Sequence, residues 1–384
     1  MSRAGAPGGR RAGFGTGLRD LFLRMLPHRA PTGLRAVGRP GRDAPVLVTG
    51  NYALTVRRVV RALRGRDAWL LCADSRGINV WCAAGGGHLT HHDIIAAVRV
   101  ADLARRVDHR DLVLPQLCAT GVERRRVAEV TGFHVRWGPA RLEDLPAYLD
   151  RGRRVVRGER RMRFPPSERL EMAVAWGWPL LASAAGLTAL LRGWALAASV
   201  GAALTASVAG LYLAVPRLRL SGAARWAAFA VLAALGYGVG VVASLLLGAA
   251  GAGSRLWLAV AEAVALGALA VDFEGTTPWY ASALAAGGRA RVELVEDRCS
   301  GAAECVQVCP RDVLAMDGRR RKVRIARPDA CIRCGACIVQ CPEQSLRFRM
   351  PDGGVVEAET VRRTRLDLLG RRSVTVDEGR SGGG

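Results

Sequence analysis

The sequence predicts three structured parts: an α/β doubly wound domain, an α-helical transmembrane domain and a small α+β domain rich in cysteine. Three observations lead to this division of the 384 residues. Strand-like and helix-like segments alternate from 41 to 150, apolar residues dominate 172–271, and seven of the ten cysteines fall within 292–349. A chain of this length has room for two or three domains. The other segments are predicted to be a disordered basic N-terminus (1–40), a basic linker (151–171), a second linker (272–291) and a disordered tail (350–384).

In the α/β domain, apolar and β-branched runs predict strands, and longer periodic segments predict helices. Because strand and helix alternate, the strands should form a parallel sheet with helices on both faces. Such sheets bind ligands beyond the carboxyl ends of their strands, and segment 77–88 follows the second strand at that edge. The strands are expected at 46–49, 68–73, 112–114 and 134–137, and the helices at 52–63, 82–107 with a break at the glycines 85–87, 124–131 and 142–149.

Four apolar segments follow, and the first three reach the length that a helix needs to cross a bilayer. Arginines gather before the first segment and between the second and third, whereas the other two loops hold only Arg192 and Arg255. Since positively charged loops stay in the cytoplasm, we expect a multi-pass protein of the cytoplasmic membrane with both soluble domains on the cytoplasmic side. Glu262 in the last segment is either a functional carboxylate or part of helix packing. The expected spans are Met172–Leu191, Trp194–Val215, Trp226–Gly248 and Leu256–Val271.

The strong positive charge does not indicate a nucleic-acid partner. Basic residues number 56 and acidic residues 33, and Lys322 is the only lysine. No basic patch with interleaved aromatic residues is present, so no nucleic acid is expected to bind. Arginine at the cytoplasmic face of a membrane explains the balance. The N-terminal segment lacks a continuous apolar stretch, so no secretory signal is expected.

The cysteine-rich domain contains the full cysteine run of bacterial ferredoxins. In these proteins three cysteines bind one iron–sulfur cluster and the fourth, which precedes proline, binds the other cluster. A zinc site is the alternative, but zinc sites rarely show this run. By the crossed pattern, one [4Fe–4S] cluster would take Cys309 together with the first three cysteines of the run. The run is Cys331-x2-Cys334-x2-Cys337-x3-Cys341-Pro342.

The first cysteine run of this domain is incomplete. Cys299, Cys305 and Cys309 occupy its first, third and fourth positions, and Ala302 stands at the second. With Cys309 assigned to the other cluster, Cys299, Cys305 and Cys341 remain. Three thiolates leave one iron without a protein ligand, which predicts a [3Fe–4S] cluster or a [4Fe–4S] cluster with one labile iron. The alternative is a degenerate site that holds no cluster.

The segment Asn79-Val80-Trp81-Cys82-Ala83-Ala84-Gly85 has an unusual composition for a surface turn. A cysteine among such neighbours is commonly a buried structural thiol, and we expect this of Cys72 and Cys118. The thiolate of Cys82 is also a soft ligand for a transition metal, and its small neighbours would let a planar ring approach the backbone. Three nearby histidines are alternative metal ligands, although solvated side chains are the simpler interpretation. They are His88, His91 and His92.

The NVWCAAG run resembles the cap helix of the corrinoid proteins of microbial mercury methylation, the HgcA type. These are related to the corrinoid subunit of the acetyl-CoA pathway's corrinoid iron–sulfur protein. The resemblance covers about residues 40–350. It includes the run from Pro45 to Tyr52, the run Asp272–Pro278, and the cysteine-rich domain, which resembles the ferredoxin partner of the HgcB type. The chain thus resembles a fusion of the two.

The resemblance implies a corrinoid cofactor beside the two iron–sulfur clusters. Cys82 would be the lower axial ligand of cobalt and the catalytic residue. The activity implied is methyl transfer from cobalt to Hg(II), with the ferredoxin reducing the cobalt. A methyl-donor methyltransferase and a reductant donor are implied partners, and the acceptor is a small inorganic species or a thiol. The residues implied to shape the helix against the corrin ring are Asn79, Val80, Trp81, Ala83, Ala84 and Gly85.

Several positions depart from the family pattern. The family motif continues Gly-Lys, but Gly86 follows Gly85 here, and no cysteine follows Cys341, where the ferredoxin partners carry a pair. Family members often have five spans, and four are counted here. Two alternatives therefore stand beside mercury methylation. One is the same methyl transfer to a different acceptor, and the other is a membrane electron-transfer ferredoxin with a decayed corrinoid site.

Overall fold

The computed structural model of the chain describes residues 24, 26–218, 223–272, 290–366 and 372–374. The chain forms two compact units. One contains the long apolar helices, and the other contains the α/β domain together with the cysteine-rich domain. All of the segment Asp272–Pro278 noted above except Asp272, like most of the linker 272–291, lies outside the described residues.

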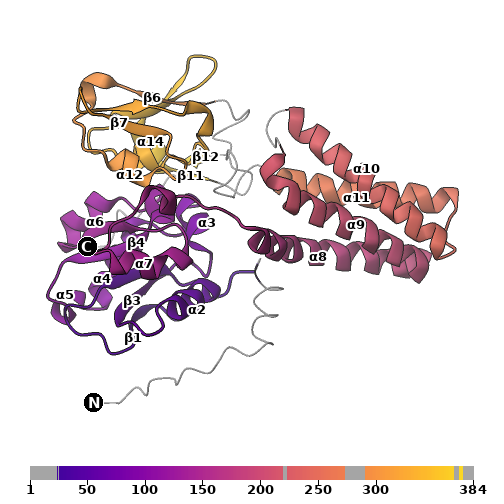
Figure 1. The fold of residues 1–384 in the computed structure, drawn as a ribbon, viewed down its shortest axis with the longest axis horizontal. Coiled ribbons are helices and arrows are strands. Elements are labelled where there is room, and N and C mark those ends of the chain that lie inside the picture. Colours follow the sequence, from indigo (N-terminus) through magenta and orange to yellow (C-terminus); the bar gives the residue numbers. More distant parts are fainter. Residues whose placement is uncertain (1–23, 25, 219–222, 273–289, 367–371, 375–384) are drawn as a thin grey trace, which may run out of the picture. The chain divides into compact units, whose positions relative to one another are not determined.

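The α/β domain has five strands with helices between them (Figure 1). The strand order in the sheet is β1-β3-β2-β4-β5, and β2, β3, β4 and β5 are parallel, as predicted. The elements are β1 Gly33–Val37, β2 Val46–Gly50, α2 Ala53–Ala62, β3 Ala68–Ala73, α3 Val80–Gly85, α4 His91–Val100, α5 Leu103–Arg106, β4 Asp111–Pro115, η1 Gln116–Thr120, α6 Arg124–Thr131, β5 His134–Gly138, η2 Leu142–Asp144, α7 Leu145–Asp150 and η3 Arg157–Arg160.

The edge strand β1 corrects the sequence-based prediction of disorder for residues 1–40. It pairs antiparallel with β3, with Gly33 opposite Cys72 and Val37 opposite Ala68. The strand GLRAV has no strong alternation of its own, and its order comes from the backbone hydrogen bonds that β3 offers at the sheet edge. Residues 1–23 lie outside the described residues.

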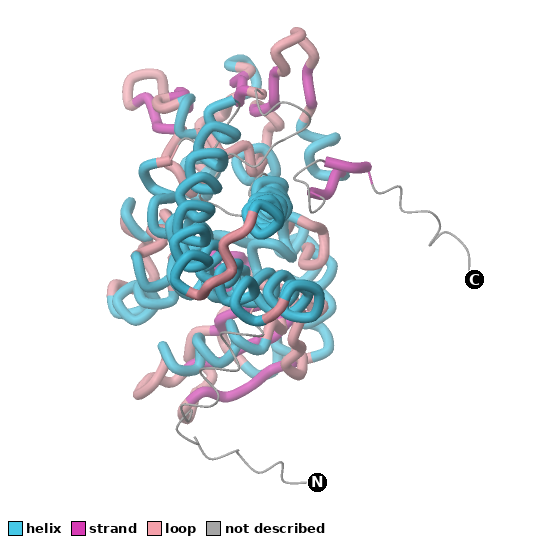
Figure 2. Tube along the Cα trace, turned by 90° about the vertical axis from the view of Figure 1, so that its right-hand side faces the viewer, coloured by secondary structure: helices cyan, strands magenta, loops and turns pink. Residues whose placement is uncertain are grey.

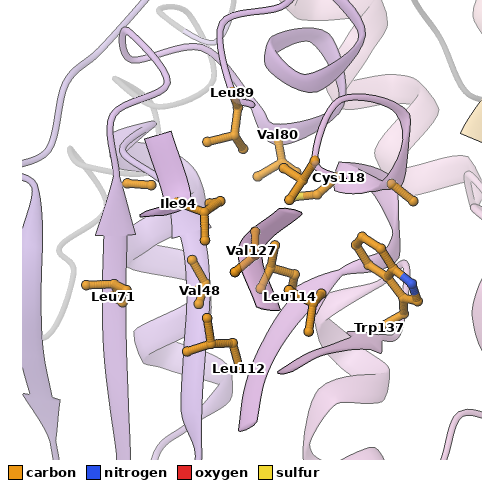
Figure 3. Packing of buried hydrophobic residues seen from close by; sticks show 14 of the residues in the cluster. Val48, Leu71, Val80, Leu89, Ile94, Leu112, Leu114, Cys118, Val127 and Trp137 are labelled. Atoms are coloured by element: carbon orange, nitrogen blue, oxygen red, sulfur yellow. The ribbon is translucent and has the colours of Figure 1, made fainter. Parts of the chain in front are cut away.

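Alternate side chains of the strands enter two separate cores, as expected for a sheet covered on both faces. On one face, Leu47, Leu70 and Val113 pack against α2 and α7. On the other face, strand residues pack against α3, α4 and α6 (Figure 3). The second core includes Val48, Leu71, Val80, Ile94, Leu112, Leu114 and Val127. This face therefore fixes α3, the helix that carries Cys82.

The cysteine-rich domain is a small α+β fold built on antiparallel strand pairs. Strand β9 pairs with β6 and β10, and β7 pairs with β8. Its elements are β6 Arg291–Leu294, η5 Glu296–Arg298, α12 Glu304–Val308, β7 Leu314–Asp317, β8 Lys322–Ile325, η6 Pro328–Ala330, α13 Ala336–Val339, β9 Leu346–Arg349, β10 Val355–Val356, α14 Ala358–Arg363, β11 Thr364–Leu366 and β12 Arg372–Val374.

The last four of these elements correct the prediction of a disordered tail over 350–384. Strand β10 extends the β9 sheet, and Ala358 and Val361 of α14 are buried in the core of the domain. Val356 and Val361 supply the apolar contacts that hold the segment in place. Residues 367–371 and 375–384 lie outside the described residues.

The other compact unit consists of four long helices, which are cyan in Figure 2 like every other helix. Within the described residues, four helices are long and apolar enough to cross a membrane, in agreement with the predicted number. The fourth apolar stretch is longer than predicted, because its helix begins at Ala252 rather than Leu256. The helices are α8 Pro166–Arg192, α9 Trp194–Ala214, α10 Ala223–Leu246 and α11 Ala252–Asp272, with the short η4 Val215–Arg217 after α9.

The four-helix unit is apolar on its outside as well as inside. Helix α9 supplies more buried side chains than any other of the four helices, including Leu196, Val200 and Leu204. Large apolar side chains such as Leu190 and Leu246 are exposed. A helical unit with an apolar exterior matches the environment of lipid tails rather than water.

Glu262 lies inside this unit and has a defined neighbourhood. It is 2% exposed, and the Ser207 hydroxyl donates to its carboxylate at 3.0 Å. A Cβ at Gly236 would lie 1.8 Å from the Ser207 hydroxyl oxygen and 2.8 Å from a carboxylate oxygen of Glu262. Helices α9, α10 and α11 therefore meet closely at this carboxylate, which supports the helix-packing alternative for Glu262.

Candidate functional sites

Cys82 lies in the first turn of α3 and is held by the residue that caps this helix. The side-chain oxygen of Asn79 accepts a hydrogen bond from the backbone N–H of Cys82 at 3.0 Å. The side-chain nitrogen of the same Asn79 donates to the sulfur of Cys82 at 3.2 Å. Asn79 is exposed and Cys82 half-buried. Cys82 is thus partly exposed, and the Asn79 side chain hydrogen-bonds to both its backbone and its sulfur.

The loop before α3 depends on Asn51, which follows β2. Its buried side-chain oxygen accepts hydrogen bonds from the backbone N–H groups of Ser75 and Gly77, both at 2.9 Å, and from the Ser75 hydroxyl at 3.1 Å. Gly77 has a φ of 72°, a conformation that favours glycine. Sequence reasoning marked Asn51 only as part of a family landmark. Its role as the centre of the loop is visible only once β2 and β3 lie side by side.

The small residues of α3 serve helix packing. Val80, Ala83 and Ala84 are 6%, 0% and 2% exposed and face the core. A Cβ at Gly121 would lie 2.3 Å from the carbonyl oxygen of Ala84, so α3 and the segment after η1 meet backbone to backbone. The resemblance placed these residues against a ring. In the structure the open side of α3 carries Asn79 and Cys82, while Trp81 and Gly85 are half-buried.

The other cysteines of the α/β domain are buried thiols. Cys72 and Cys118 are 0% and 1% exposed, and burial raises the pKa of both thiols. Among the histidines, His91 lies 3.5 Å from Glu123 and its ring stacks near that of His92. His88 is half-buried, and burial lowers its pKa. The structural role predicted for Cys72 and Cys118 agrees with this burial.

The seven cysteines of the small domain lie close enough to affect one another's ionisation, and their division into two cluster sets stays a prediction. Burial, and then the neighbouring thiols of Cys309, Cys331, Cys334 and Cys305, raise the pKa of Cys337. Burial, and then the thiols of Cys341 and Cys299, raise the pKa of Cys305 to about 12. Buried thiols of this kind ionise at neutral pH only when a metal binds them. The donor set therefore fits iron–sulfur clusters.

The predicted four-cysteine set lines a small, partly open cavity with a volume of about 20 Å³. All four sulfur-bearing residues line it, together with Pro310 and Arg333 among others. Backbone N–H groups point at the sulfurs, from Val313 to Cys309 at 3.2 Å and from Arg333 to Cys331 at 3.4 Å. Such N–H donors stabilise thiolates bound to a cluster.

The spacing of the cysteines favours iron–sulfur clusters over a single zinc ion, because zinc sites rarely show a four-cysteine run that ends in proline. Among the described residues, no group of three or more His, Cys, Asp or Glu side chains is close enough to hold one ion.

The three-cysteine set has an open side. Cys305 and Cys341 are 6% and 5% exposed, but Cys299 is half-buried and Ala302 is exposed. The Ser345 backbone N–H donates to the sulfur of Cys341 at 3.3 Å. Since Ala302 occupies the place of the fourth ligand, the iron that lacks a protein thiolate would face solvent.

Two glutamines join the cysteine-rich domain to the α/β domain within their common unit. The side-chain nitrogen of Gln340 donates to the carbonyl oxygens of Ala119 and Val122, at 2.8 and 2.7 Å, and its side-chain oxygen accepts from the Arg124 backbone N–H at 3.3 Å. The side-chain nitrogen of Gln116 donates to the carbonyl oxygen of Val308 at 2.9 Å. Both glutamines are buried.

Apolar contacts extend this interface toward the Cys82 helix. Ile332 and Cys334 belong to the same buried cluster as Val80 and Ala83 of α3. Helix α13, which contains Cys337, contacts η1, and η1 in turn contacts α3. The cluster-binding domain and the helix of Cys82 therefore pack around the same short segment, Gln116–Thr120.

Comparisons with known proteins identify both domains. A family model described as CO dehydrogenase/acetyl-CoA synthase delta subunit matches residues 24–149. A model described as 4Fe-4S dicluster domain matches residues 291–344. The chain carries one domain of each type.

Curated relatives of the α/β domain are gamma subunits of the acetyl-CoA decarbonylase/synthase complex. That of Methanopyrus kandleri is 32% identical over 127 residues, which are 33% of this chain and 27% of the relative. The gamma subunit of Archaeoglobus fulgidus is 32% identical over 144 residues, which are 37% of this chain and 28% of the relative. The gamma subunit of Methanosarcina acetivorans is 35% identical over 123 residues, which are 31% of this chain and 26% of the relative. The chain therefore spans about a quarter of the length of these relatives.

Proposed function

We propose that this chain is a membrane-anchored corrinoid-dependent methyltransferase of the mercury-methylation type. Cys82 would be a ligand of the corrinoid's cobalt, and Hg(II) would be the methyl acceptor. A bound corrinoid supplies the methyl group and the cobalt chemistry of its transfer. The fused dicluster domain would provide electrons to the cobalt, and the four apolar helices would hold the unit at the cytoplasmic membrane.

The observation that carries this proposal is the partly exposed Cys82, whose sulfur is hydrogen-bonded by Asn79, at the carboxyl edge of the sheet. Parallel sheets bind ligands at this edge. The domain around it matches subunits of an acetyl-CoA-forming complex, and the NVWCAAG run resembles the cap helix of mercury-methylation proteins. A thiolate donates charge to a bound metal, which favours transfer of a methyl group to a soft acceptor.

The side chains around Cys82 have separate tasks in this proposal. Asn79 orients the sulfur and donates a hydrogen bond to it. Val80, Ala83 and Ala84 anchor α3 on the core, so the sulfur is held on a rigid element. Asn51 fixes the loop that leads into the helix.

The test is anaerobic methylmercury formation from Hg(II) in membranes of a corrinoid-producing host. Wild type, Cys82→Ala and Cys118→Ala would be run side by side, with bound cobalt counted in each. We expect product and cobalt with wild type and with Cys118→Ala, because Cys118 is a buried thiol of the core. Cys82→Ala should give no methylmercury.

A second candidate is methyl transfer to another soft metal, a metalloid or a thiol. It is favoured by Gly86, which stands where the family has lysine, and by the lack of any cysteine after Cys341. Cobalt bound in a Cys82-dependent manner without methylmercury would select this candidate. A protein that binds clusters but no cobalt would instead be a membrane electron-transfer protein.

A further inference from the structure

A large groove lies where the cysteine-rich domain meets the α/β domain, within their common unit. Its volume is about 1010 Å³. Its walls come from α4 and α6 on one side and from the segment after α13 and from α14 on the other. Nothing in the proposed methyl transfer uses this groove, since Cys82 does not line it.

The groove is positively charged. Three glutamates line it, and each is paired with a basic neighbour within the groove: Glu123 with Arg362, Glu129 with Arg126, and Glu359 with Arg363. Six arginines against three glutamates leave a formal charge of +3 with neutral histidines. The arginines are Arg99, Arg124, Arg125, Arg126, Arg362 and Arg363.

The groove also reaches the iron–sulfur site that lacks one cysteine. Cys341 of the three-cysteine set and the following Pro342 line it. Arg362 donates to the carbonyl oxygens of Val339 and Cys341 at 3.3 and 3.0 Å, and Arg125 donates to that of Pro342 at 3.3 Å. Charged residues and a cluster ligand therefore share one wall, which these hydrogen bonds hold in place.

The arginines are spread over an open surface rather than gathered in a closed pocket. The side chains of Arg126 and Arg363 are 64% and 72% exposed. The side chain of Arg362 is the more buried one, at 15% exposed. Exposed charges of one sign steer a large charged partner and are weak at holding a small anion in water. This favours a protein partner with an acidic face over a small phosphate compound.

We propose that this groove docks an acidic one-electron carrier protein, which supplies the electrons that the proposed function requires. In the transfer the carrier loses one electron and is oxidised, and the three-cysteine iron–sulfur site gains that electron. No bond forms or breaks. The inference rests on the iron–sulfur half of the proposed function and does not depend on cobalt or on the methyl acceptor.

A flavodoxin is a suitable probe because it is an acidic one-electron carrier. Its binding to the full-length protein in detergent would be measured by surface plasmon resonance at low and high salt. The groove variant Arg125→Glu/Arg126→Glu should weaken binding about tenfold or more, because reversing rim charges replaces attraction by repulsion. The control Arg319→Glu/Arg320→Glu makes the same change in net charge on exposed residues of the turn after β7, and should change binding about twofold at most.

A second variant separates docking from local damage to α6. Arg99→Glu/Arg363→Glu changes two exposed arginines on α4 and α14 and should weaken binding to a similar extent. Equal losses in the groove and control variants, no measurable binding of wild type, or displacement of flavodoxin by micromolar pyrophosphate would each overturn the proposal. Cys82→Ala should bind flavodoxin like wild type, so failure of methyl transfer and failure of docking are distinguishable.

Discussion

At the scale of single residues, Asn79 has two tasks that can be separated by substitution. Its oxygen caps α3, and its nitrogen donates to the sulfur of Cys82. Asn79→Asp keeps the acceptor for the Cys82 N–H but replaces the donor to the sulfur by a negatively charged oxygen. Loss of a hydrogen bond to a thiolate costs about 1 kcal/mol and the added charge disfavours the thiolate further, so alkylation of Cys82 at neutral pH should slow by about fivefold or more.

The rate would be followed by mass spectrometry on the peptide that contains Cys82, in protein without corrinoid. Asn79→Ala loses both contacts and should in addition lower helix stability by about 1 kcal/mol. If Asn79→Asp were alkylated as fast as wild type, the contact between the Asn79 side-chain nitrogen and the sulfur would have no effect on the thiolate.

The exposed Ala302 makes a second prediction at this scale. In wild type, mild oxidation should release one iron from the three-cysteine site, leaving about seven irons per chain and a [3Fe–4S] signal in the EPR spectrum. Ala302→Cys should restore the fourth ligand, retain about eight irons and remove that signal. Ala302→Ser, of similar size but without a thiol, is the matched control and should behave like wild type. An unchanged spectrum in Ala302→Cys would show that this position does not reach the cluster.

Residues whose chemistry is local could be predicted from the sequence, and residues whose role depends on distant partners could not. The cysteine sets follow from spacing, because cluster ligands must come from fixed intervals along the chain. Asn51 reaches Ser75 across two strands, and Gln340 reaches Ala119 across domains. Their side chains are ordinary in the sequence, and only the folded chain brings their partners within hydrogen-bonding distance.

At the scale of elements, η1 is the segment on which the Cys82 helix and the cysteine-rich domain both pack. Gln340 supplies three of the hydrogen bonds at this interface. Gln340→Ala would leave two carbonyl oxygens and one N–H without partners, at a cost of about 2–4 kcal/mol. Hydrogen exchange in the segment 119–124 should therefore accelerate about 30-fold or more.

Gln344→Ala serves as the control, because Gln344 is also on the cysteine-rich domain but is exposed. It should leave exchange in the segment 119–124 unchanged. Equal acceleration in both variants would mean that Gln340 does not fix the interface specifically.

The elements that sequence analysis missed are those stabilised by a neighbour. The central strands are apolar enough to be recognised individually, such as AWLLCA in β3. In contrast, β1 and β10 are short or polar and are ordered by pairing with β3 and β9. Composition alone therefore suggested disorder at both ends of the chain. Whether these segments form strands depends instead on their pairing with β3 and β9.

At the scale of the whole molecule, the proposed membrane arrangement makes a prediction about sidedness. In this arrangement, four spans with arginine-rich approaches would leave both soluble domains on the cytoplasmic side. Alkaline phosphatase, which is active only outside the cytoplasm, should be active when fused after Gly193 or Gly251 and inactive when fused after Arg217. Activity after Arg217 together with inactivity after Gly193 would reverse the proposed orientation.

The antiparallel edge strand β1 has a consequence for how this protein can be divided. A fragment that starts at residue 41, the boundary that composition suggests, would lack β1 and leave one side of β3 without a pairing strand. An uncovered edge that contains Trp69 and Leu71 is a template for strands of other molecules. Such a fragment should self-associate, whereas one that begins near Pro27 would keep its own edge covered and remain monomeric.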